Sequence, residues 1–523
     1  MEGSMADFAT PGSGRTSRDT GNVSANFAAA DMTAFSTLVL TTEHPAVIAT
    51  AGIYANFSEA YKVHNDSQDV LTLIEKYASL CDSYLTKVRE VTECIVSRKG
   101  EPVWMEAMAC HILLTDERNT WKLMSVLLRD RLKAEVLTEE GGNNTILLDR
   151  ALEASDRIIV EASTARNSFA RQVQLVVDWL ESCAAHQCCI GYGDGMLEYF
   201  AEGRCTWKNT LQHVQSCADV SKAPSSDVTE LDPDASSREQ LLTRDLDRDE
   251  KCHLFHSVFF HRRAGKLQRA QKLAADNGHF WLAAALGGWK PYLGLNNGSI
   301  MGAVSTQLVD GNFYRDLWKC ACRESATNTR CSLYERAVYG ALSGNLQAML
   351  PACTTWEDKP WARMRAVIDV CLEQELQTGM QQATNLEPLP PGCPSEHETF
   401  EAVFRDLQTA AGVSESRDQE IKHILQRGLV LNDAVSMVEE ILEWVTAQVI
   451  EPPLLTMRFL AHMVLLLRQV GCETATGACS ALVRTYLDML IEDGHGPLVA
   501  PYAATQPAAE QAAMYKKLAK PQN

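Results

Sequence analysis

Gly265-Lys266-Leu267-Gln268 opens a stretch that reaches Trp281-Leu282-Ala283 sixteen residues after its glycine. Gly344-Asn345-Leu346-Gln347 opens a second stretch, which reaches Trp361-Ala362-Arg363 seventeen residues after its glycine. In each stretch the glycine favours a turn, a short helix follows, and the tryptophan stands where the next helix begins. We expect each tryptophan to pack back on the short helix. Such a hairpin buries its apolar face only by stacking on a neighbour, so the pair predicts an irregular α-helical solenoid.

The helical period continues on both sides of these hairpins. Residues 68–98 hold apolar side chains at helical spacing, and 478–491 form another apolar helix. Asn432 or Asp433 is placed to cap a helix at its N-terminus. Two further helix faces are predicted by residues at the same spacing: Phe169, Val173, Val176 and Leu180, and Val435, Val438, Leu442 and Val445.

Strand signals are scarce along the chain. No sustained alternation of β-branched residues is bounded by Asn-Gly or Asp-Gly turns. The longest apolar stretch, Phe459 to Leu467, contains His462 and is shorter than the roughly 20 residues that a membrane span needs. We therefore predict an all-α fold with essentially no sheet, in which Phe459 to Leu467 belong to a buried core helix.

Composition changes along the chain suggest its organisation. Gly and Ser without a helical period mark the N-terminus as disordered. An acidic connection ends in Asp245, Asp247 and Glu250, which suit the start of a new helix, and a run of prolines cannot be helical. The predicted parts are a disordered tail at 1–40, N-terminal helices at 41–220, the acidic connection at 221–250, helical hairpins at 251–385, the proline-rich linker at 386–396, C-terminal helices at 397–505 and a frayed tail at 506–523.

The overall charge argues against two classes of partner. The chain carries 67 acidic and 48 basic residues, a formal net charge of -19. An acidic surface repels phosphate backbones and anionic lipid heads, so we expect no direct nucleic-acid binding and no membrane insertion. The 17 cysteines are odd in number and no secretory leader opens the chain, so we expect free thiols in a reducing compartment.

No motif in the sequence predicts catalysis. Gly191-Tyr192-Gly193-Asp194-Gly195 follows a helix end rather than a strand and lacks the Lys-Ser/Thr of a phosphate-binding loop, so we interpret it as a helix connector. His253, His256 and His261 share a helix, but no H-E-x-x-H motif accompanies them. No nucleophile elbow and no kinase signature is present. We therefore expect no enzymatic activity and no cofactor.

Two groups of cysteines raise the question of zinc. Each group lacks the second spaced pair that a structural zinc site usually has. Cysteine is also among the residues most often buried as a small apolar group, which favours free core thiols and no metal. The groups are Cys183, His186, Cys188 and Cys189, and Cys320, Cys322 and Cys331.

Three stretches, in order between about 45 and 505, resemble a known family. The first is Gln174-Leu175-Val176-Val177-Asp178-Trp179-Leu180-Glu181 with Trp207-Lys208-Asn209-Thr210-Leu211. The second is Asp232-Pro233-Asp234-Ala235, Leu246-Asp247-Arg248-Asp249-Glu250 and Phe280-Trp281-Leu282-Ala283-Ala284-Ala285 with Gly288-Trp289-Lys290. The third is Tyr314-Arg315-Asp316-Leu317-Trp318-Lys319, Glu335-Arg336-Ala337, Tyr339, Leu342-Ser343-Gly344-Asn345 and Trp356-Glu357-Asp358 with Trp361-Ala362. Together they resemble a stem nucleoporin of the Y-shaped nuclear pore coat, the vertebrate hundred-and-seven-kilodalton and yeast eighty-four-kilodalton family.

This resemblance implies a fold and a role. The family's α-solenoid doubles back and has crown, trunk and tail parts, as in vesicle-coat proteins. The role implied is that of a structural scaffold at the nuclear pore complex and nuclear envelope, needed for pore assembly and hence for mRNA export and protein transport. The alternative left open is a cytoplasmic vesicle-coat or tethering solenoid.

The resemblance also implies partners. The N-terminal half would pair with a companion stem nucleoporin of about ninety-six kilodaltons, through helices between about 150 and 215. We expect Trp179, Leu180, Tyr199 and Phe200 to contribute, because large aromatics dominate interface energetics; the alternative is that Trp179 and Leu180 are core residues. The family's chains continue further and dock a propeller-bearing nucleoporin there, so we expect a fragment or short form in which that contact is in doubt.

Overall fold

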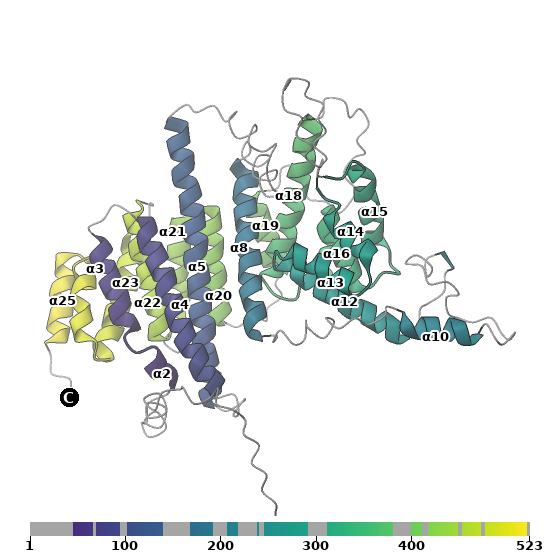
Figure 1. The fold of residues 1–523 in the computed structure, drawn as a ribbon. Coiled ribbons are helices and arrows are strands. Elements are labelled where there is room, and N and C mark those ends of the chain that lie inside the picture. Colours follow the sequence, from purple (N-terminus) through teal and green to yellow (C-terminus); the bar gives the residue numbers. More distant parts are fainter. Residues whose placement is uncertain are drawn as a thin grey trace, which may run out of the picture. The chain divides into compact units, whose positions relative to one another are not determined.

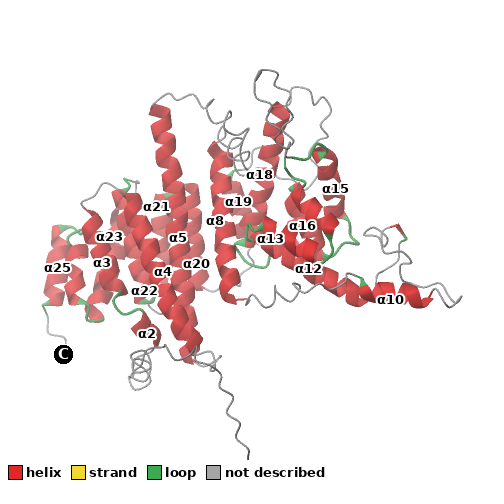
Figure 2. Ribbon diagram, viewed as in Figure 1, coloured by secondary structure: helices red, strands yellow, loops and turns green. Residues whose placement is uncertain are grey.

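The computed structural model describes twelve ranges of the chain, and every regular element in them is helical (Figure 2). No strand occurs within these ranges, which confirms the all-α prediction. The described residues are 45–65, 70–94, 102–139, 168–191, 207–217, 238–239, 245–290, 311–379, 399–410, 417–447, 452–471 and 476–519. The tail at 1–40, the linker at 386–396 and most of the connection at 221–250 lie outside them.

The helices follow one another along the chain with the labels of Figure 1. They are α2 (Pro45–Ala49), α3 (Ile53–Asn65), α4 (Val70–Cys94), α5 (Pro102–Glu139), α8 (Ser168–Gly191), α10 (Lys208–Cys217), α12 (Asp245–Arg263), α13 (Leu267–Asp276), α14 (Phe280–Gly287), α15 (Arg315–Thr327), α16 (Leu333–Ser343), α17 (Leu346–Met349), η2 (Leu350–Ala352), α18 (Asp358–Gly379), α19 (Phe400–Ala410), α20 (Arg417–Leu431), α21 (Ala434–Ala447), α22 (Leu454–Gln469), α23 (Thr476–Glu492), η3 (Gly496–Leu498), α24 (Val499–Ala503) and α25 (Ala508–Leu518).

The chain divides into two compact units, of which the first comprises residues 1–53 and 82–114. Its described part holds α2 and segments of α4 and α5. Ile53 and Val88 are fully buried, and Tyr84 is nearly so. The Thr50 hydroxyl donates to the Ala46 carbonyl at 2.8 Å and closes the turn that follows α2.

The second unit, residues 54–81 and 115–523, is built from helices that pack on their neighbours in sequence. Contacts join α12 to α13, α13 to α14, α15 to α16, α18 to α19, α20 to α21 and α22 to α23. Each helix presents one apolar face, so stacking of neighbours buries those faces in turn. This serial packing is the arrangement of an α-solenoid.

Within the second unit the chain doubles back, as the resemblance implied. Arg131 of α5 donates to the Leu429 carbonyl of α20 at 2.8 Å. Glu117 of α5 forms a buried ion pair with Arg458 of α22, which lies 341 residues further along the chain. Helices from the N-terminal and C-terminal parts therefore lie side by side (Figure 1).

An aromatic core fills the space between these returning helices. We use this name for Phe57, Tyr77, His462, Tyr486 and Tyr502, all of which are fully buried or nearly so. The His462 ring meets the ring of Phe57 edge-on at 5.3 Å between centroids. Its Nδ1 lies 2.8 Å from the Arg458 carbonyl and its Nε2 lies 3.1 Å from the Tyr502 hydroxyl. Helix α22 is buried from residue 456 to 467, as predicted for the apolar stretch that contains His462.

The two predicted hairpins are present. Gly265 and Gly344 have φ of 69° and 74°, a region in which only glycine is unstrained, and a helix starts two residues after each of them. The tryptophans also have a neighbour that was not predicted. Trp281 and Trp361 lie next to the rings of Phe255 and Phe259, so both reach α12.

Helix ends follow the expected cap chemistry. The Asp433 carboxylate accepts from the Ser436 N–H at 3.1 Å, so Asp433 rather than Asn432 caps α21. Asp245 and Asp247 lie in the first turn of α12, next to the positive end of its dipole.

The C-terminus departs from the frayed tail expected for 506–523. Helix α25 spans Ala508–Leu518 and is anchored by the buried Met514 and by Lys517, which donates to Asp488 at 2.9 Å.

Among the described helices, none combines the length and the apolar character that a membrane crossing requires.

Candidate functional site

The predicted interface residues on α8 are part of the interior of the second unit. Trp179 and Leu180 are 7% and 1% exposed. The Trp179 Nε1–H donates to the Asn119 carbonyl of α5 at 2.8 Å. Their burial corresponds to the alternative considered from the sequence, that they are core residues. Tyr199 and Phe200 lie outside the described residues.

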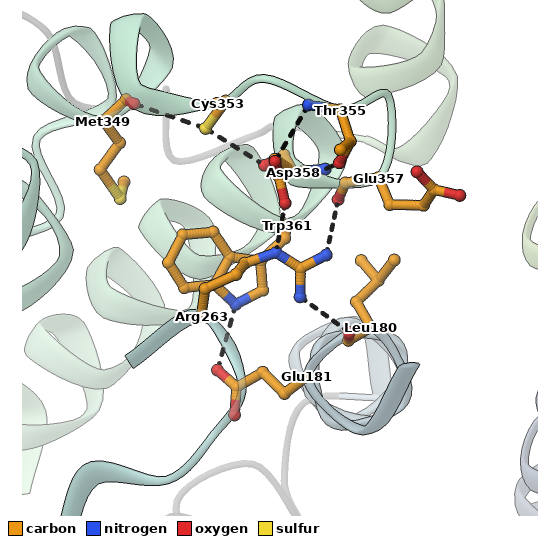
Figure 3. Close-up of polar contacts among 9 residues, drawn as sticks. All are labelled: Leu180, Glu181, Arg263, Met349, Cys353, Thr355, Glu357, Asp358 and Trp361. Atoms are coloured by element: carbon orange, nitrogen blue, oxygen red, sulfur yellow. Dashed lines mark hydrogen bonds and ion pairs between the residues drawn. The ribbon is translucent and has the colours of Figure 1, made fainter. Parts of the chain in front are cut away.

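Leu180 belongs to a polar junction of three helices (Figure 3). The buried Arg263 at the end of α12 donates from Nη1 to the Leu180 carbonyl at 2.7 Å. It also donates from Nε to Asp358 Oδ1 at 2.8 Å, and from Nη2 to the Glu357 carbonyl at 3.3 Å. Its guanidinium lies over the Trp361 ring, 5.3 Å from the ring centroid. One side chain thus joins α8, α12 and the start of α18, so we call this group, with Glu181, the α8–α12–α18 junction.

Glu181 supplies the second set of bonds in the junction. Its Oε1 accepts from the Trp361 Nε1–H at 3.1 Å and from Arg262 Nη1 at 3.2 Å. Burial, reinforced by Arg365, lowers the pKa of Arg262 to about 10, and Glu181 acts against this change. A side chain at Gly265 would lie 2.7 Å from Glu181 Oε2, so the glycine permits this close approach of α12 to α8.

Asp358 has a second role at the start of α18. Its Oδ2 accepts from the Thr355 N–H at 3.0 Å, and its own N–H donates to the Thr355 hydroxyl at 3.3 Å. This reciprocal pair satisfies N–H groups that a helix start leaves open, as in a capping box. The carboxylate that fixes Arg263 is therefore itself held in place by the local sequence.

A largely buried lysine extends the polar contacts to α20 and α5. Lys422 Nζ lies 2.8 Å from Asp116 Oδ1 and forms a second ion pair with Glu357. Burial alone would lower the pKa of Lys422, but the two carboxylates raise it above its usual value. Burial raises the pKa of Asp116 despite Lys422, whereas the pKa of Glu357 is lowered because Lys422 outweighs its burial. The lysine stays charged and joins α20 and α5 to the turn that precedes α18.

The buried groups around the junction are suited to fixing helices. Burial raises the pKa of Cys183 to about 12, so its thiol is neither a nucleophile nor a ready ligand at neutral pH. Burial lowers the pKa of His261 to about 4, with a further contribution from Arg269. Within the described ranges no three His, Cys, Asp or Glu side chains gather as metal ligands. The side chains of Cys188 and Cys189 lie outside those ranges.

Sequence reasoning singled out Leu180 and Trp361 of this junction, but not Arg263, Glu181 or Asp358. Arg263 is only one of two arginines at a helix end, and no spacing rule relates Arg263 to Glu181 or Asp358. A signal was nevertheless present, because Glu181, Asp358 and Trp361 all lie in stretches that carry the family resemblance. Stretches that are far apart in sequence converge on one set of bonds in the structure (Figure 3).

Comparison with known proteins gives consistent matches along the chain. The family model described as nuclear pore protein 84 / 107 matches residues 112–519. The mouse nuclear pore complex protein Nup107 is 34% identical over 485 residues, which are 92% of this chain and 51% of the mouse protein. The Drosophila melanogaster nuclear pore complex protein Nup107 is 27% identical over 471 residues, which are 89% of this chain and 54% of that protein. The Schizosaccharomyces pombe nucleoporin nup107 is 28% identical over 275 residues, which are 50% of this chain and 33% of that protein. The chain spans about half the length of the mouse and fly relatives.

Proposed function

Because the chain belongs to the nuclear pore protein 84 / 107 family, we propose that it is a structural scaffold of the Y-shaped coat in the outer ring of the nuclear pore. The observation that carries this proposal is the family match over residues 112–519, which covers most of the described helices. Pore assembly, and with it mRNA export and protein transport, would depend on this scaffold. We propose no catalytic step.

The proposed role is mechanical. The contacts within α12–α14 and within α15–α18, and the return of α20 and α22 onto α5, place these helices against fixed neighbours. The α8–α12–α18 junction and the Lys422 ion pairs fix relative helix positions with charged hydrogen bonds, each contributing roughly 1.5–3 kcal/mol. A rigid stack of this kind holds the surfaces that bind neighbouring coat subunits at constant spacing.

We place the chain at the nuclear pore complex in the nuclear envelope, and a localisation experiment tests this. A fluorescent tag on the endogenous full-length protein should give a continuous nuclear rim. Affinity capture from the same cells, followed by mass spectrometry, should recover coat nucleoporins. Scattered cytoplasmic puncta and the recovery of vesicle-coat subunits instead would contradict the pore assignment and support a vesicle-coat solenoid.

The partner proposed for the N-terminal half is the companion stem nucleoporin of about ninety-six kilodaltons. The interface proposed between about 150 and 215 rests on Tyr199 and Phe200, because Trp179 and Leu180 are enclosed by this chain's own helices. The double variant Tyr199→Asp, Phe200→Asp should bind the purified companion more weakly than the wild type. Unaltered affinity in a variant with a native circular dichroism spectrum would remove this patch. A propeller-bearing stem-end nucleoporin is proposed as a second partner, on the family resemblance alone.

A further inference from the structure

The start of α10 has no capping side chain of its own. Trp207 stands at the N-cap position, directly before the first helical residue Lys208. An indole donates through its N–H and offers no acceptor, so it cannot bond to the free N–H groups of the first turn. The backbone of Trp207 also has a φ of 62°, which a bulky residue rarely adopts. The N–H groups that open α10 therefore need an acceptor from elsewhere in the chain.

The acceptor comes from α12. Asp247 Oδ1 accepts from the backbone N–H of Asn209 at 3.3 Å and from its side-chain Nδ2 at 2.8 Å. Asp247 Oδ2 accepts from the backbone N–H of Thr210 at 2.6 Å, and the Thr210 hydroxyl donates to the same oxygen. Asn209 and Thr210 are the second and third residues of α10, whose N–H groups an N-cap side chain normally binds. A carboxylate of one helix thus caps another helix, 37 residues away in sequence from Thr210.

The position of Asp247 stabilises its buried charge. The residue is 3% exposed and lies in the first turn of its own helix. The positive N-terminal ends of α10 and α12 therefore both lie next to one carboxylate. Since a buried charge is costly unless it is hydrogen-bonded, separating the two helices would remove bonds on which this carboxylate depends.

Apolar packing contributes little to holding α10 in place. Thr210 is fully buried, and it is the only buried residue among those of α10 whose side chains the structure describes. Leu211 and Val214 are half-buried. Helix α13 has the same length of ten residues but buries three of them, including Leu273. A helix with few buried apolar contacts opens at a lower free energy than the core does, so the bonds of Asp247 are the main attachment of α10.

We propose that Asp247 is a latch: its bonds hold α10 on α12, and without them α10 opens as a unit while the rest of the second unit keeps its fold. This inference goes beyond the proposed scaffold function, because it concerns the chain by itself. It also gives a shared role to two stretches that carry the family resemblance. Residues 207–211 supply the donors of the latch, and residues 246–250 supply the acceptor.

Hydrogen–deuterium exchange of the full chain, read by mass spectrometry, tests the latch. In Asp247→Ala, the amides of residues 212–217 should exchange roughly tenfold to a hundredfold faster than in the wild type, as the loss of charge-assisted hydrogen bonds would cause. These amides have their acceptors inside α10, so their exchange reports opening of the whole helix and not only of its first turn. The amides of α13 and α16 should exchange as in the wild type.

Asp245→Ala is the matched control. Asp245 lies in the same first turn of α12, its side chain is 83% exposed, and it accepts from Arg248 of its own helix. Residues 212–217 should exchange at the wild-type rate in this variant. Asp247→Asn, which keeps one acceptor oxygen but no charge, should give a smaller increase than Asp247→Ala.

A second pair of variants probes the latch from the α10 side, and it serves as the test if Asp247→Ala does not fold. Thr210→Val keeps nearly the same shape but lacks the hydroxyl donor, so residues 212–217 should exchange roughly tenfold faster. Thr210→Ser keeps the hydroxyl and should stay closer to the wild type than Thr210→Val does.

Three results would overturn the latch. Unchanged exchange of residues 212–217 in Asp247→Ala and in Thr210→Val would show that other contacts hold α10. Faster exchange confined to the amides of Asn209 and Thr210 would show that the carboxylate caps α10 without holding it in place. An equal increase in α10, α13 and α16 would show that Asp247 supports the whole unit and not the attachment of one helix.

Discussion

Arg263 and Arg458 are both buried arginines of the second unit, yet their surroundings differ. At the α8–α12–α18 junction, Nε, Nη1 and Nη2 of Arg263 donate to Asp358, Leu180 and Glu357. In the aromatic core, the fully buried Arg458 pairs through Nη2 with Glu117 and lies 3.9 Å from the centroid of the Phe57 ring. Its Nε and Nη1 have no hydrogen-bond partner among the described residues.

This difference separates two ways of holding helices. The junction distributes one charge over three directional bonds, two of them to backbone carbonyls, and so fixes how helices are rotated. In the aromatic core, the packing of rings holds the helices together. The buried charge of Arg458 is compensated there by a single carboxylate, that of Glu117. Since an uncompensated buried charge costs more than a lost hydrogen bond, the two arginines should respond differently to substitution.

The largest effect is expected at Arg458. The variant Arg458→Met leaves the Glu117 carboxylate buried and uncompensated, which should cost about 3–5 kcal/mol of unfolding free energy. Urea denaturation measures this cost. Arg468→Met on the same helix is the matched control. Arg468 is only half-buried and donates to Ser480 at 3.2 Å, so this variant should lose about 1 kcal/mol.

A smaller effect is expected at Arg263. The variant Arg263→Met should cost about 2–3 kcal/mol, because Asp358 keeps its bond from Thr355 and two of the lost acceptors are carbonyls. Arg263→Lys keeps the charge but cannot reproduce the planar fork, so it should recover only part of the loss. If Arg263→Met lost more unfolding free energy than Arg458→Met, the expected order of the two sites would be contradicted.

The pH dependence of the unfolding free energy gives a further test of the aromatic core. Burial, with a contribution from Arg458, lowers the pKa of His462 to about 3 from an ordinary value of 6.5. The unfolded chain therefore takes up a proton near pH 6.5 that the folded chain takes up only near pH 3. The stability contributed by neutral His462 is complete above pH 6.5 and falls by about 1.4 kcal/mol per pH unit below it.

The measurement is unfolding free energy at several pH values between 6.5 and 4. His462→Gln should reduce the slope by about 1.4 kcal/mol per pH unit, because the amide does not titrate. Burial also lowers the pKa values of His279 and His423 to about 4, so part of the slope should persist. An unchanged slope in His462→Gln would show that this histidine is not held neutral in the core.

The smallest effect on stability is expected at the exposed Phe280 of α14 and Leu317 of α15. Phe280→Glu and Leu317→Glu should each change the unfolding free energy by no more than about 0.5 kcal/mol, since neither side chain is packed in the isolated chain. Thermal unfolding checks this. A loss above 2 kcal/mol, roughly that of a buried site, would show that these side chains support this chain's own fold.

Much of the fold could be predicted because helix periodicity and turn residues are local signals. The turn glycines, the buried face of α22 and the cap at Asp433 all follow from residues within one or two turns of each other. The helix at 508–518 was not predicted, because its stability comes from Met514 and from Lys517 bonding to α23, which are contacts over a longer range.

The junction and the doubling back depend on contacts that no local pattern shows. Trp361 bonds to Glu181 across 180 residues, and Arg458 pairs with Glu117 across 341. The contacts of Trp281 and Trp361 with α12 were likewise not predicted, since the sequence shows where a helix starts but not every neighbour of an indole. The family resemblance marked several of these residues, but it did not show which of them lie next to one another in the fold.

The return of α22 onto α5 is the central structural claim, and a double-mutant cycle tests it most directly. Urea unfolding of the wild type, Glu117→Gln, Arg458→Met and the double variant gives the coupling energy between the two positions. Glutamine retains an acceptor for the Trp121 Nε1–H, which donates to Glu117 at 3.1 Å. The structure predicts a favourable coupling of about 2–3 kcal/mol. A coupling within error of zero would contradict direct contact between these two helices.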